Sequence, residues 1–330
     1  MEKVTIATVA RHAGVSRQTV SNVLNAPGVV REDTRARVRE AIAALGYRAN
    51  QAARQMRTGR SRIIAVRIEP ARDGINGSVL DRFLHGLTDA AATAGYRVML
   101  YTATDDAGEI ATYEDLLSAY VLDAFVLTST HHGDVRTSWL AGRGVPFVTF
   151  GRPWGAPDTH PWVDVDNAAG TAEATQRLLD TGHRRIGFLG WPAGSGVGDA
   201  RRSGWAATLA TAGIDAAGLD RATTDGVDTG AAAATDLLDR AEPPTALVCA
   251  SDSLALGVLR AARDLGRHCA VVGFDDTAVA QAVGLTSVSQ PLAEAAARCM
   301  DLLAGVLDGN AGGLSHHVLL RPSLMIRQTA

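Results

Sequence analysis

The chain of 330 residues is 46% hydrophobic and 20% charged, which supplies packed cores and excludes a mostly disordered protein. Its length predicts two or three domains, and no run of about 18 apolar residues indicates a membrane span. The net charge of −3 conceals a division, because residues 1–62 carry twelve basic and four acidic side chains whereas the other 268 residues carry 20 and 31. A basic head on an acidic body is typical of a head that meets a polyanion.

The three cysteines, Cys249, Cys269 and Cys299, are widely spaced and form no CxxC pair. An odd number at these spacings argues against a disulfide framework and a structural zinc site, and predicts a reducing cytoplasm. The first residues lack the apolar core of a signal peptide.

The first part of the chain has a pattern typical of a helix-turn-helix. Thr5 can cap a helix over residues 5–12, whose apolar side chains fall on one face. Gly14 supplies a tight turn because glycine tolerates positive φ. Ser16 can then cap a second helix over residues 17–25.

The second helix is expected to pack on the first through Val20 and Leu24. A third helix, expected over Glu32–Leu45, ends at Gly46 and completes a three-helix core. Residues 1–48 therefore predict a complete DNA-binding head.

Polar side chains on the opposite face of the second helix are candidates for reading DNA. In such heads the first residues of this helix meet base edges in the major groove, where arginine suits guanine and the amides suit adenine. The predicted base-reading residues are Arg17, Gln18 and Asn22, and an ordinary solvated helix face is the alternative. The residues suited to positioning contacts with phosphates are Ser16, Thr19, Ser21 and Asn25, and Thr5 completes the DNA-binding candidates of the head.

Two runs of sequence identify a family: VTIATVARHAGVSRQTVSNVLN and YRANQAARQMRTGRSRIIAV. They resemble the lactose-repressor (LacI/GalR) family of bacterial transcription regulators, and the resemblance covers essentially the whole chain. It implies that residues 49–61 form a hinge that becomes helical when two subunits sit on operator DNA. Met56 stands where the family wedges a leucine into the minor groove, and Asn50 and Ala53 are implied DNA contacts beside it.

Beyond the hinge, short apolar runs alternate with helical stretches, which predicts an α/β core of parallel sheets covered on both faces. The expected strands are Ile63–Ile68, Arg97–Tyr101, Ala124–Thr128 and Phe147–Phe150, then a second set, Trp162–Asp164, Ile186–Leu189, Ala246–Ala250 and Ala270–Phe274. The expected helices include Val79–Ala94, Asn167–Thr181 and Ser253–Leu265.

Two successive α/β lobes of this kind match a periplasmic-binding-protein-like core over residues 62–330. We expect the first lobe at about 62–161 plus 291–320, and the second at about 162–290 plus 321–330. The helix Pro291–Leu307 and a strand near His316–Leu320 would return to the first lobe, making three crossovers. Ligands of open α/β sheets bind at the carboxyl ends of strands, here in the cleft between the lobes.

The second lobe offers two charged candidates for an effector. Arg201 matches the Arg-x-x-Gly of the family and its fork could clamp two hydroxyls, with a surface arginine as the alternative. Asp275 ends the strand VVGF, where it could accept two sugar hydroxyls or merely cap a helix. Ser251 stands where the family often has asparagine. Asp166 and the next residue, Asn167, are expected to cap a helix more than to touch a ligand.

The first lobe and the crossover offer further candidates. Polar side chains that follow expected strands are Glu69, Asn76, His131 and His132. Trp154 and Trp162 could each stack on a sugar ring or pack in the core. A metal pair at the two histidines is disfavoured because adjacent residues point apart, and no metal or cofactor is expected.

The run Gly194–Gly198 reads GxGxG rather than GxGxxG and lacks the lysine of a P-loop, which favours a flexible loop at the cleft mouth. The sequence contains no GxSxG or HExxH motif that would indicate an enzyme. The places where the family usually carries aromatic residues, GINGSV and residues 219–240, have none, which leaves the effector open.

The sequence thus predicts a cytoplasmic, DNA-binding regulator, most simply a repressor, that senses a mono- or disaccharide. It would bind a near-palindromic operator as a homodimer rather than a tetramer, because no heptad pattern follows the last expected strand. A purine or nucleoside sensor of the same family is the nearest alternative. A sugar-binding transport protein would leave the basic head without a role.

Overall fold

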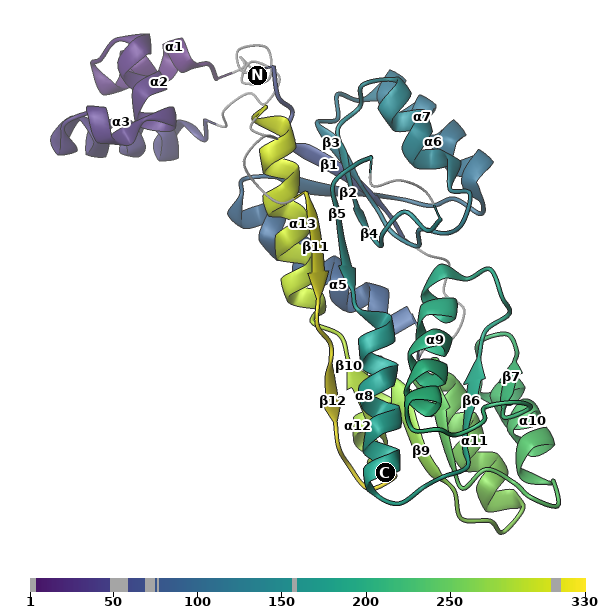
Figure 1. Cartoon of the computed structure of the whole chain (residues 1–330). Coiled ribbons are helices and arrows are strands. Elements are labelled where there is room, and N and C mark those ends of the chain that lie inside the picture. Colours follow the sequence, from purple (N-terminus) through teal and green to yellow (C-terminus); the bar gives the residue numbers. More distant parts are fainter. Residues whose placement is uncertain (1–3, 48–58, 69–74, 76, 156–158, 310–315) are drawn as a thin grey trace. The chain divides into compact units, whose positions relative to one another are not determined.

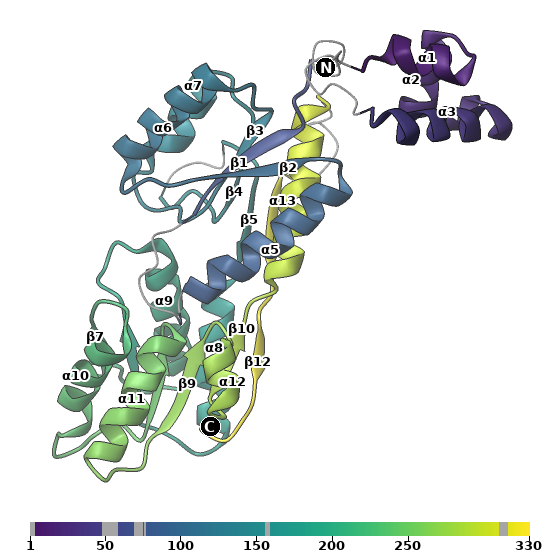
Figure 2. The same ribbon diagram turned by 180° about the vertical axis from the view of Figure 1, so that it is seen from behind.

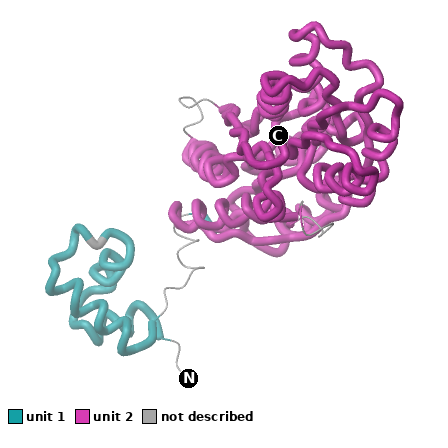
Figure 3. Tube along the Cα trace, turned by 90° about the horizontal axis from the view of Figure 1, so that it is seen from below, with its two compact units in different colours: residues 1–61 teal, residues 62–330 magenta. Residues whose placement is uncertain are grey.

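The computed structural model describes residues 4–47, 59–68, 75, 77–155, 159–309 and 316–330. It divides the chain into two compact units, Met1–Ser61 and Arg62–Ala330 (Figure 3). The implied hinge contacts Asn50, Ala53 and Met56 lie outside the described residues, as do the effector candidates Glu69 and Asn76.

The first unit contains α1 (Ile6–Ala13), α2 (Arg17–Asn25), a short 3-10 turn η1 (Pro27–Val29) and α3 (Glu32–Leu45). Thr5 and Ser16 cap α1 and α2 through their side chains, as their sequence positions predicted. Gly14 joins the two helices with φ of 63°, in the left-handed region that glycine enters without strain.

The core of this unit takes one fully buried valine from each helix: Val9, Val20 and Val38. From α2 the second buried side chain is Val23, whereas Leu24 is 38% exposed, so the prediction that Leu24 packs inward was wrong. Successive helical residues turn by about 100°, so a face centred between Val20 and Val23 leaves Leu24 at its margin.

The second unit contains two six-stranded sheets (Figures 1 and 2). The first sheet has the order β11-β5-β4-β3-β1-β2, and all of its paired strands are parallel. Its strands are β1 (Ile63–Arg67), β2 (Arg97–Tyr101), β3 (Ala124–Leu127), β4 (Phe147–Phe150), β5 (Trp162–Val165) and β11 (His317–Leu320).

Helices cover both faces of this sheet because its strands are apolar on both faces. Ile64 and Val66 join a core cluster with α5 (Gly77–Thr93) and α13 (Leu292–Leu307), which lie side by side in Figures 1 and 2. Ala65, on the opposite face of β1, joins a separate cluster. That cluster includes residues of α6 (Asp106–Ala119) and α7 (Val135–Gly142). We refer to this sheet and these four helices as the first lobe.

The second sheet has the order β12-β10-β9-β8-β6-β7, with only β12 antiparallel to its neighbour among the paired strands. Its strands are β6 (Ile186–Gly190), β7 (Asp220–Ala222), β8 (Ala246–Cys249), β9 (Ala270–Phe274), β10 (Thr286–Ser289) and β12 (Ser323–Met325). The second lobe is completed by α8 (Asn167–Asp180), α9 (Gly196–Thr211), α10 (Val227–Leu238), α11 (Asp252–Asp264) and α12 (Ala278–Ala282). The predicted α/β class with parallel sheets is confirmed.

One strand was assigned to the wrong set by the sequence. β5, expected to open the second set, pairs with β4 and β11 in the first sheet. The chain first crosses between lobes at Asp166, after β5, rather than near Pro161. An apolar run predicts a strand, but which sheet it joins depends on strands distant in sequence. The other two crossovers lie between β10 and α13 and between β11 and β12. None of the described helices combines the length and apolar character needed to cross a membrane.

Candidate functional site

The exposed face of α2 carries the predicted base-reading residues. Arg17 and Gln18 are exposed in the first turn, and Asn22 lies one turn further along. Gln18 Nε2 donates to Asn22 Oδ1 at 2.9 Å, which leaves the Gln18 carbonyl and the Asn22 amide group to face outward together. An acceptor and a donor side by side are what the major-groove edge of adenine requires.

The expected phosphate contacts cluster at the two ends of α2. Ser16 accepts from the Thr19 backbone N–H at 3.0 Å, and Asn25 Nδ2 donates to the Ser21 carbonyl at 2.7 Å. Thr5 makes a reciprocal capping pair with Thr8 at the start of α1. The N-terminus of a helix favours phosphate because its first N–H groups point outward.

A cavity of about 570 Å³ lies between the two lobes of the second unit. Both sheets reverse their strand order beside it, the first between β1 and β3 and the second between β6 and β8. Carboxyl ends of strands meet at such switch points, and ligands of open α/β sheets bind there. The polar residues that line the cavity are Ser129, Thr130, His131, Asp164, Asn167, Ser195, Arg201, Thr223, Thr224, Asp225, Asp275 and Gln290.

Arg201 and Asp275 lie together at the centre of the second-lobe wall. Arg201 Nη2 is 3.5 Å from Asp275 Oδ1, and the guanidinium lies over the ring of Phe274 at 3.6 Å. Arg201 also donates from Nε to Asn167 Oδ1 at 2.8 Å and from Nη1 to the Ala250 carbonyl. The guanidinium is therefore a buried, fixed support and not a surface arginine.

Asp275 is aimed at the cavity from the end of β9. Thr277, not Asp275, caps α12, so the alternative reading of Asp275 as a helix cap does not apply. Gln290 Nε2 donates to Asp275 Oδ1 at 2.7 Å, while no described residue donates to Oδ2. Asp275 has φ of 106°, a strained value for a residue with a side chain, and such strain concentrates at functional sites.

Burial dominates the ionisation of this carboxyl. It raises the pKa of Asp275 to about 7 against the opposing influence of Arg201 and the hydrogen bond from Gln290. Burial likewise raises the pKa of Asp164, although Arg152 Nε donates to its Oδ2 at 2.6 Å. The cavity thus holds hydrogen-bond acceptors that are costly to leave without partners.

Two further second-lobe residues were missed by the sequence. Asp225, after β7, lines the cavity and accepts from Ser251 Oγ at 2.5 Å. Ser251 itself is fully buried and caps α11, so it supports the wall without lining it. Trp191, directly after β6, supplies the second-lobe aromatic face that residues 219–240 lack.

Of the first-lobe candidates discussed next, His131 lines the cavity and Trp162 does not. His131 lines the cavity, with Nδ1 3.0 Å from the His132 carbonyl and Nε2 3.1 Å from Asp106 Oδ1. Burial would lower the pKa of His131, but these two hydrogen bonds raise it above the usual value. Trp162 begins β5 at the amino edge of the sheet, away from the carboxyl edge where the cavity lies. Its ring stacks on His317 at 5.0 Å and is 8% exposed, so of the two predicted alternatives core packing applies and sugar stacking does not.

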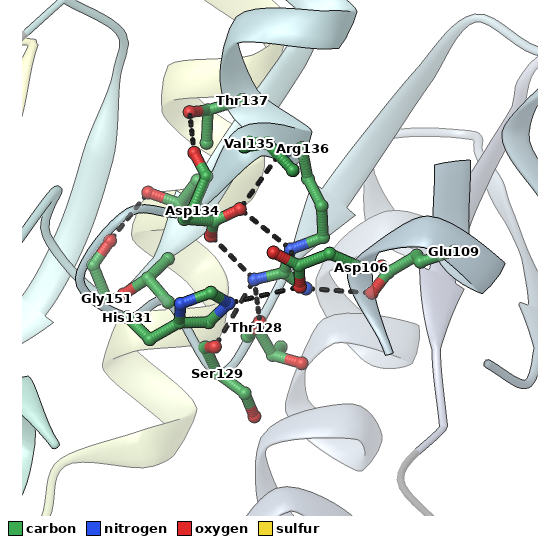
Figure 4. A network of polar contacts seen from close by, with 12 residues as sticks. Asp106, Glu109, Thr128, Ser129, His131, Asp134, Val135, Arg136, Thr137 and Gly151 are labelled. Carbon is green, nitrogen blue, oxygen red and sulfur yellow. Dashed lines mark hydrogen bonds and ion pairs between the residues drawn. The ribbon is translucent and has the colours of Figure 1, made fainter. Parts of the chain in front are cut away.

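A buried polar network supports His131 (Figure 4). Arg136 Nη2 donates to the carbonyls of Thr128 and Ser129, and Nη1 donates to Glu109 at 2.8 Å. A second chamber of about 460 Å³, which shares Ser129 and His131 with the first, is lined by this network.

Asp106, His131 and Asp134 bring potential metal-ligand atoms within 4.8 Å of one another in this network. Both nitrogens of His131 face acceptors, however, which is the pattern of a protonated ring, and Arg136 already pairs with Asp134 at 2.7 Å. A cation would have to displace the guanidinium, so the arrangement suits ion pairing better than metal binding.

Asn167, Asp164 and Gln290 complete the set that sequence reasoning undervalued or missed. Asp166 caps α8 as expected, but the neighbouring Asn167 turns into the cavity wall. Asp164 and Gln290 both stand within two residues of the point where a strand leaves for the other lobe. A polar residue at the end of an apolar run was the available signal for each.

Comparisons with known proteins agree with both units. Residues 5–50 match the family of bacterial regulatory proteins called lacI, and residues 175–330 match a periplasmic binding protein-like domain. The HTH-type transcriptional regulator CelR of Thermobifida fusca is 36% identical over 308 residues, which is 87% of each chain. The HTH-type transcriptional regulator AglR of Rhizobium meliloti (strain 1021) is 32% identical over 98% of this chain and 93% of its own.

A solved structure of the transcriptional regulator CelR in complex with cellobiose is 32% identical, with a TM-score of 0.74 over 99% of this chain and 100% of its own. These regulators thus resemble both parts of this chain, the helix-turn-helix unit and the two-lobed core, over nearly its whole length. The chain belongs to the LacI family of bacterial DNA-binding transcriptional regulators.

Proposed function

We propose that this regulator is a repressor whose affinity for operator DNA is controlled by a small carbohydrate bound between the two lobes. The observation that carries the proposal is the fixed Arg201–Asp275 pair on the wall of the 570 Å³ cavity. A buried carboxylate whose second oxygen accepts from no described residue can accept hydroxyl groups, and the adjacent guanidinium can donate to them. The protein would act in the cytoplasm, where its DNA is.

The chemistry of the wall favours an uncharged polyol. Three carboxylates, Asp164, Asp225 and Asp275, line the cavity together with the single guanidinium of Arg201 among its described lining residues. Trp191 and Phe150 offer flat apolar faces for the C–H side of a sugar ring. The volume lies within the usual range for small-ligand pockets and accommodates two sugar rings. The CelR relative, whose solved structure holds cellobiose, supports a disaccharide.

A thermal-shift screen of the full chain tests the proposed effector class. The panel contains glucose, cellobiose, maltose, adenosine and guanine, each at millimolar concentration. We expect a disaccharide to raise the midpoint of unfolding, because a ligand that binds only the folded state stabilises it. A shift with adenosine or guanine and none with any sugar would contradict the carbohydrate proposal and favour a purine sensor.

Arg17→Ala is expected to weaken binding to the operator by about 1–3 kcal/mol and to relax base preference at one position in each half-site. Fluorescence anisotropy with operator and scrambled duplexes at fixed salt measures both effects. The matched control is Arg37→Ala, an exposed arginine on α3. Equal losses on operator and scrambled DNA would show that Arg17 contacts only phosphate.

The regulator is expected to be a homodimer in solution, because two heads are needed to read a near-palindrome. Apolar side chains remain exposed at Val279 on α12 and Val283 directly after it, and at Met325 at the end of β12 and Ile326 directly after it. A second copy of the core would cover such surfaces. Light scattering at micromolar concentration should give twice the chain mass of 34.4 kDa. A monomer or a stable tetramer would contradict the prediction.

A further inference from the structure

The indole of Trp154, which follows β4 in the first lobe, lies against Gly196 in the first turn of α9 in the second lobe. A Cβ atom added at Gly196 would overlap three atoms of this indole ring. A ring cannot bend out of the way as the end of a flexible side chain can. The contact between the lobes therefore requires glycine at this position.

A second contact between the lobes flanks the first. His132 Nε2 lies 4.0 Å from Asp199 Oδ2, and the His132 ring centroid is 6.4 Å from that of Trp154. Both side chains are half exposed, so this contact alone contributes little. We refer to His132 and Trp154 of the first lobe, with Gly196 and Asp199 of the second, as the clasp.

The clasp explains the glycine-rich run Gly194–Gly198, which does not match a nucleotide-binding motif. Ser195 caps α9, so Gly196 to Gly198 form a helical turn, and the prediction of a flexible loop was wrong for these residues. A Cβ at Gly198 would lie 3.0 Å from Trp191 Cε3. The two glycines thus leave room for two indoles, one from each lobe, at the edge of the cavity.

Trp154 is committed to the opposite lobe and not to a ligand. Its Nε1 is buried without a hydrogen-bond partner among the described groups, and Arg152 lies over its ring at 5.0 Å. Gly196 lines the cavity, whereas Trp154 is not among the described lining residues. The indole therefore packs against the first turn of α9 instead of offering its face to a sugar.

We propose that the clasp holds the two lobes together and so sets the affinity of the cavity for its effector. The proposal rests on the proposed function, in which the cavity encloses a small molecule. A ligand held between lobes binds tightly only in the closed arrangement, so its apparent affinity scales with the fraction of closed molecules. Weakening the clasp lowers that fraction without removing any group that touches the ligand.

Hydrogen–deuterium exchange of the full chain, without ligand, tests the clasp directly. The variants are Gly196→Ala, Trp154→Ala, their double variant, and Gly142→Ala as the control, since a Cβ at Gly142 at the end of α7 meets nothing within 4 Å. Gly196→Ala is expected to speed exchange at least about threefold in the first-lobe segments 129–134 and 150–155, in the lobe that the substitution does not alter. Gly142→Ala should leave these segments unchanged.

The double variant separates the contact from any effect on α9 itself. The three atoms nearest to the added methyl group all belong to the indole, so Gly196→Ala should add no further opening in the Trp154→Ala background. First-lobe exchange that is unchanged in Gly196→Ala, or raised equally with and without the indole, would overturn the clasp.

Calorimetric titration with cellobiose gives the second readout. We expect Trp154→Ala, which alters no described lining residue, to bind this sugar about tenfold more weakly than the unaltered protein and Gly142→Ala to bind it equally well. Equal affinity in Trp154→Ala would overturn the role of the clasp in binding. If the unaltered protein does not bind cellobiose, that result counts against the proposed effector, whereas the exchange measurements still decide whether the clasp exists.

Discussion

Asp275→Asn is expected to weaken carbohydrate binding about a hundredfold and to abolish release of the operator at effector concentrations that act on the unaltered protein. The side chain keeps its shape, but a carboxylate that accepts two hydroxyls becomes an amide that offers one acceptor and one donor. Losing the charge from two hydrogen bonds at a buried site costs about 3 kcal/mol, which corresponds to about a hundredfold in affinity.

Operator affinity without effector should be nearly unchanged in the same variant, because Asp275 belongs to the effector-binding core and not to the DNA-binding head. The measurement is a titration of operator binding with and without the sugar identified by the screen. Asp228→Asn, an exposed carboxylate on α10 paired with Arg260, is the matched control. If the Asp275→Asn variant still releases the operator at the effector concentration that acts on the unaltered protein, Asp275 only supports the fold.

The raised pKa gives the same residue a pH signature. Asp275 ionises at about pH 7 in the folded protein, so below that pH most molecules carry a protonated carboxyl that is a poorer acceptor. Effector affinity should therefore fall as the pH is lowered from 8 to 6, and it should vary less in Asp275→Asn.

The contribution of Asp275 to folding stability changes with pH in the opposite sense. A carboxyl with a raised folded pKa binds its proton more tightly than in the unfolded chain, so its contribution declines as the pH rises from about 4 to 7.

Effector and operator are linked through the whole regulator. If the sugar changes the affinity for the operator by some factor, operator DNA must change the affinity for the sugar by the same factor. A coupling free energy of about 1–3 kcal/mol is typical. Sugar titrations with and without operator DNA therefore check the same coupling from the other side.

Glu109→Ala is expected to lower the free energy of unfolding by about 3–5 kcal/mol, because it removes a buried carboxylate that two guanidinium groups share. Glu109 is 1% exposed and contacts Arg136 in the network in Figure 4. Its Oε2 accepts from Arg67 Nη1 at 2.6 Å and from Arg136 Nη1 at 2.8 Å. Its Oε1 accepts from the hydroxyls of Tyr101 and Tyr113 at 2.8 and 2.7 Å, so four donors lose their acceptor together.

Thermal unfolding followed by circular dichroism measures this loss, and a decrease in the midpoint of about 10 °C is expected for a core of this size. Glu114→Ala on the same helix is the control, since Glu114 is exposed and its ion pair with Arg143 contributes less than about 1 kcal/mol. Equal effects of the two substitutions would mean that the buried network is not a unit. Because Arg136 also holds the carbonyl of Ser129 on the cavity wall, Glu109→Ala should weaken effector binding as well.

Local chemistry in the sequence determined the head almost completely. Thr5, Gly14 and Ser16 act through groups within four residues of themselves, so their caps and turn could be read without knowledge of the rest of the chain. The α/β alternation of the core and the position of Asp275 at a strand end could be predicted in the same way, whereas Arg201 lies inside α9 and does not open that helix. Each is a property of a single segment, whose hydrophobic periodicity or terminus can be recognised in the amino-acid sequence.

The tertiary structure decided everything that depends on which segments meet. β5 joined the first sheet because β4 and β11 flank it there, and Trp162 consequently lies at the amino edge, away from the cavity. Gln290 reaches Asp275, fifteen residues away in sequence, only because the strand before the crossover lies beside β9. The run Gly194–Gly198 looks like a loop in the sequence, but an indole from the other lobe lies against Gly196. Pairing between distant segments is chosen by packing over the whole fold, and no local pattern carries that information.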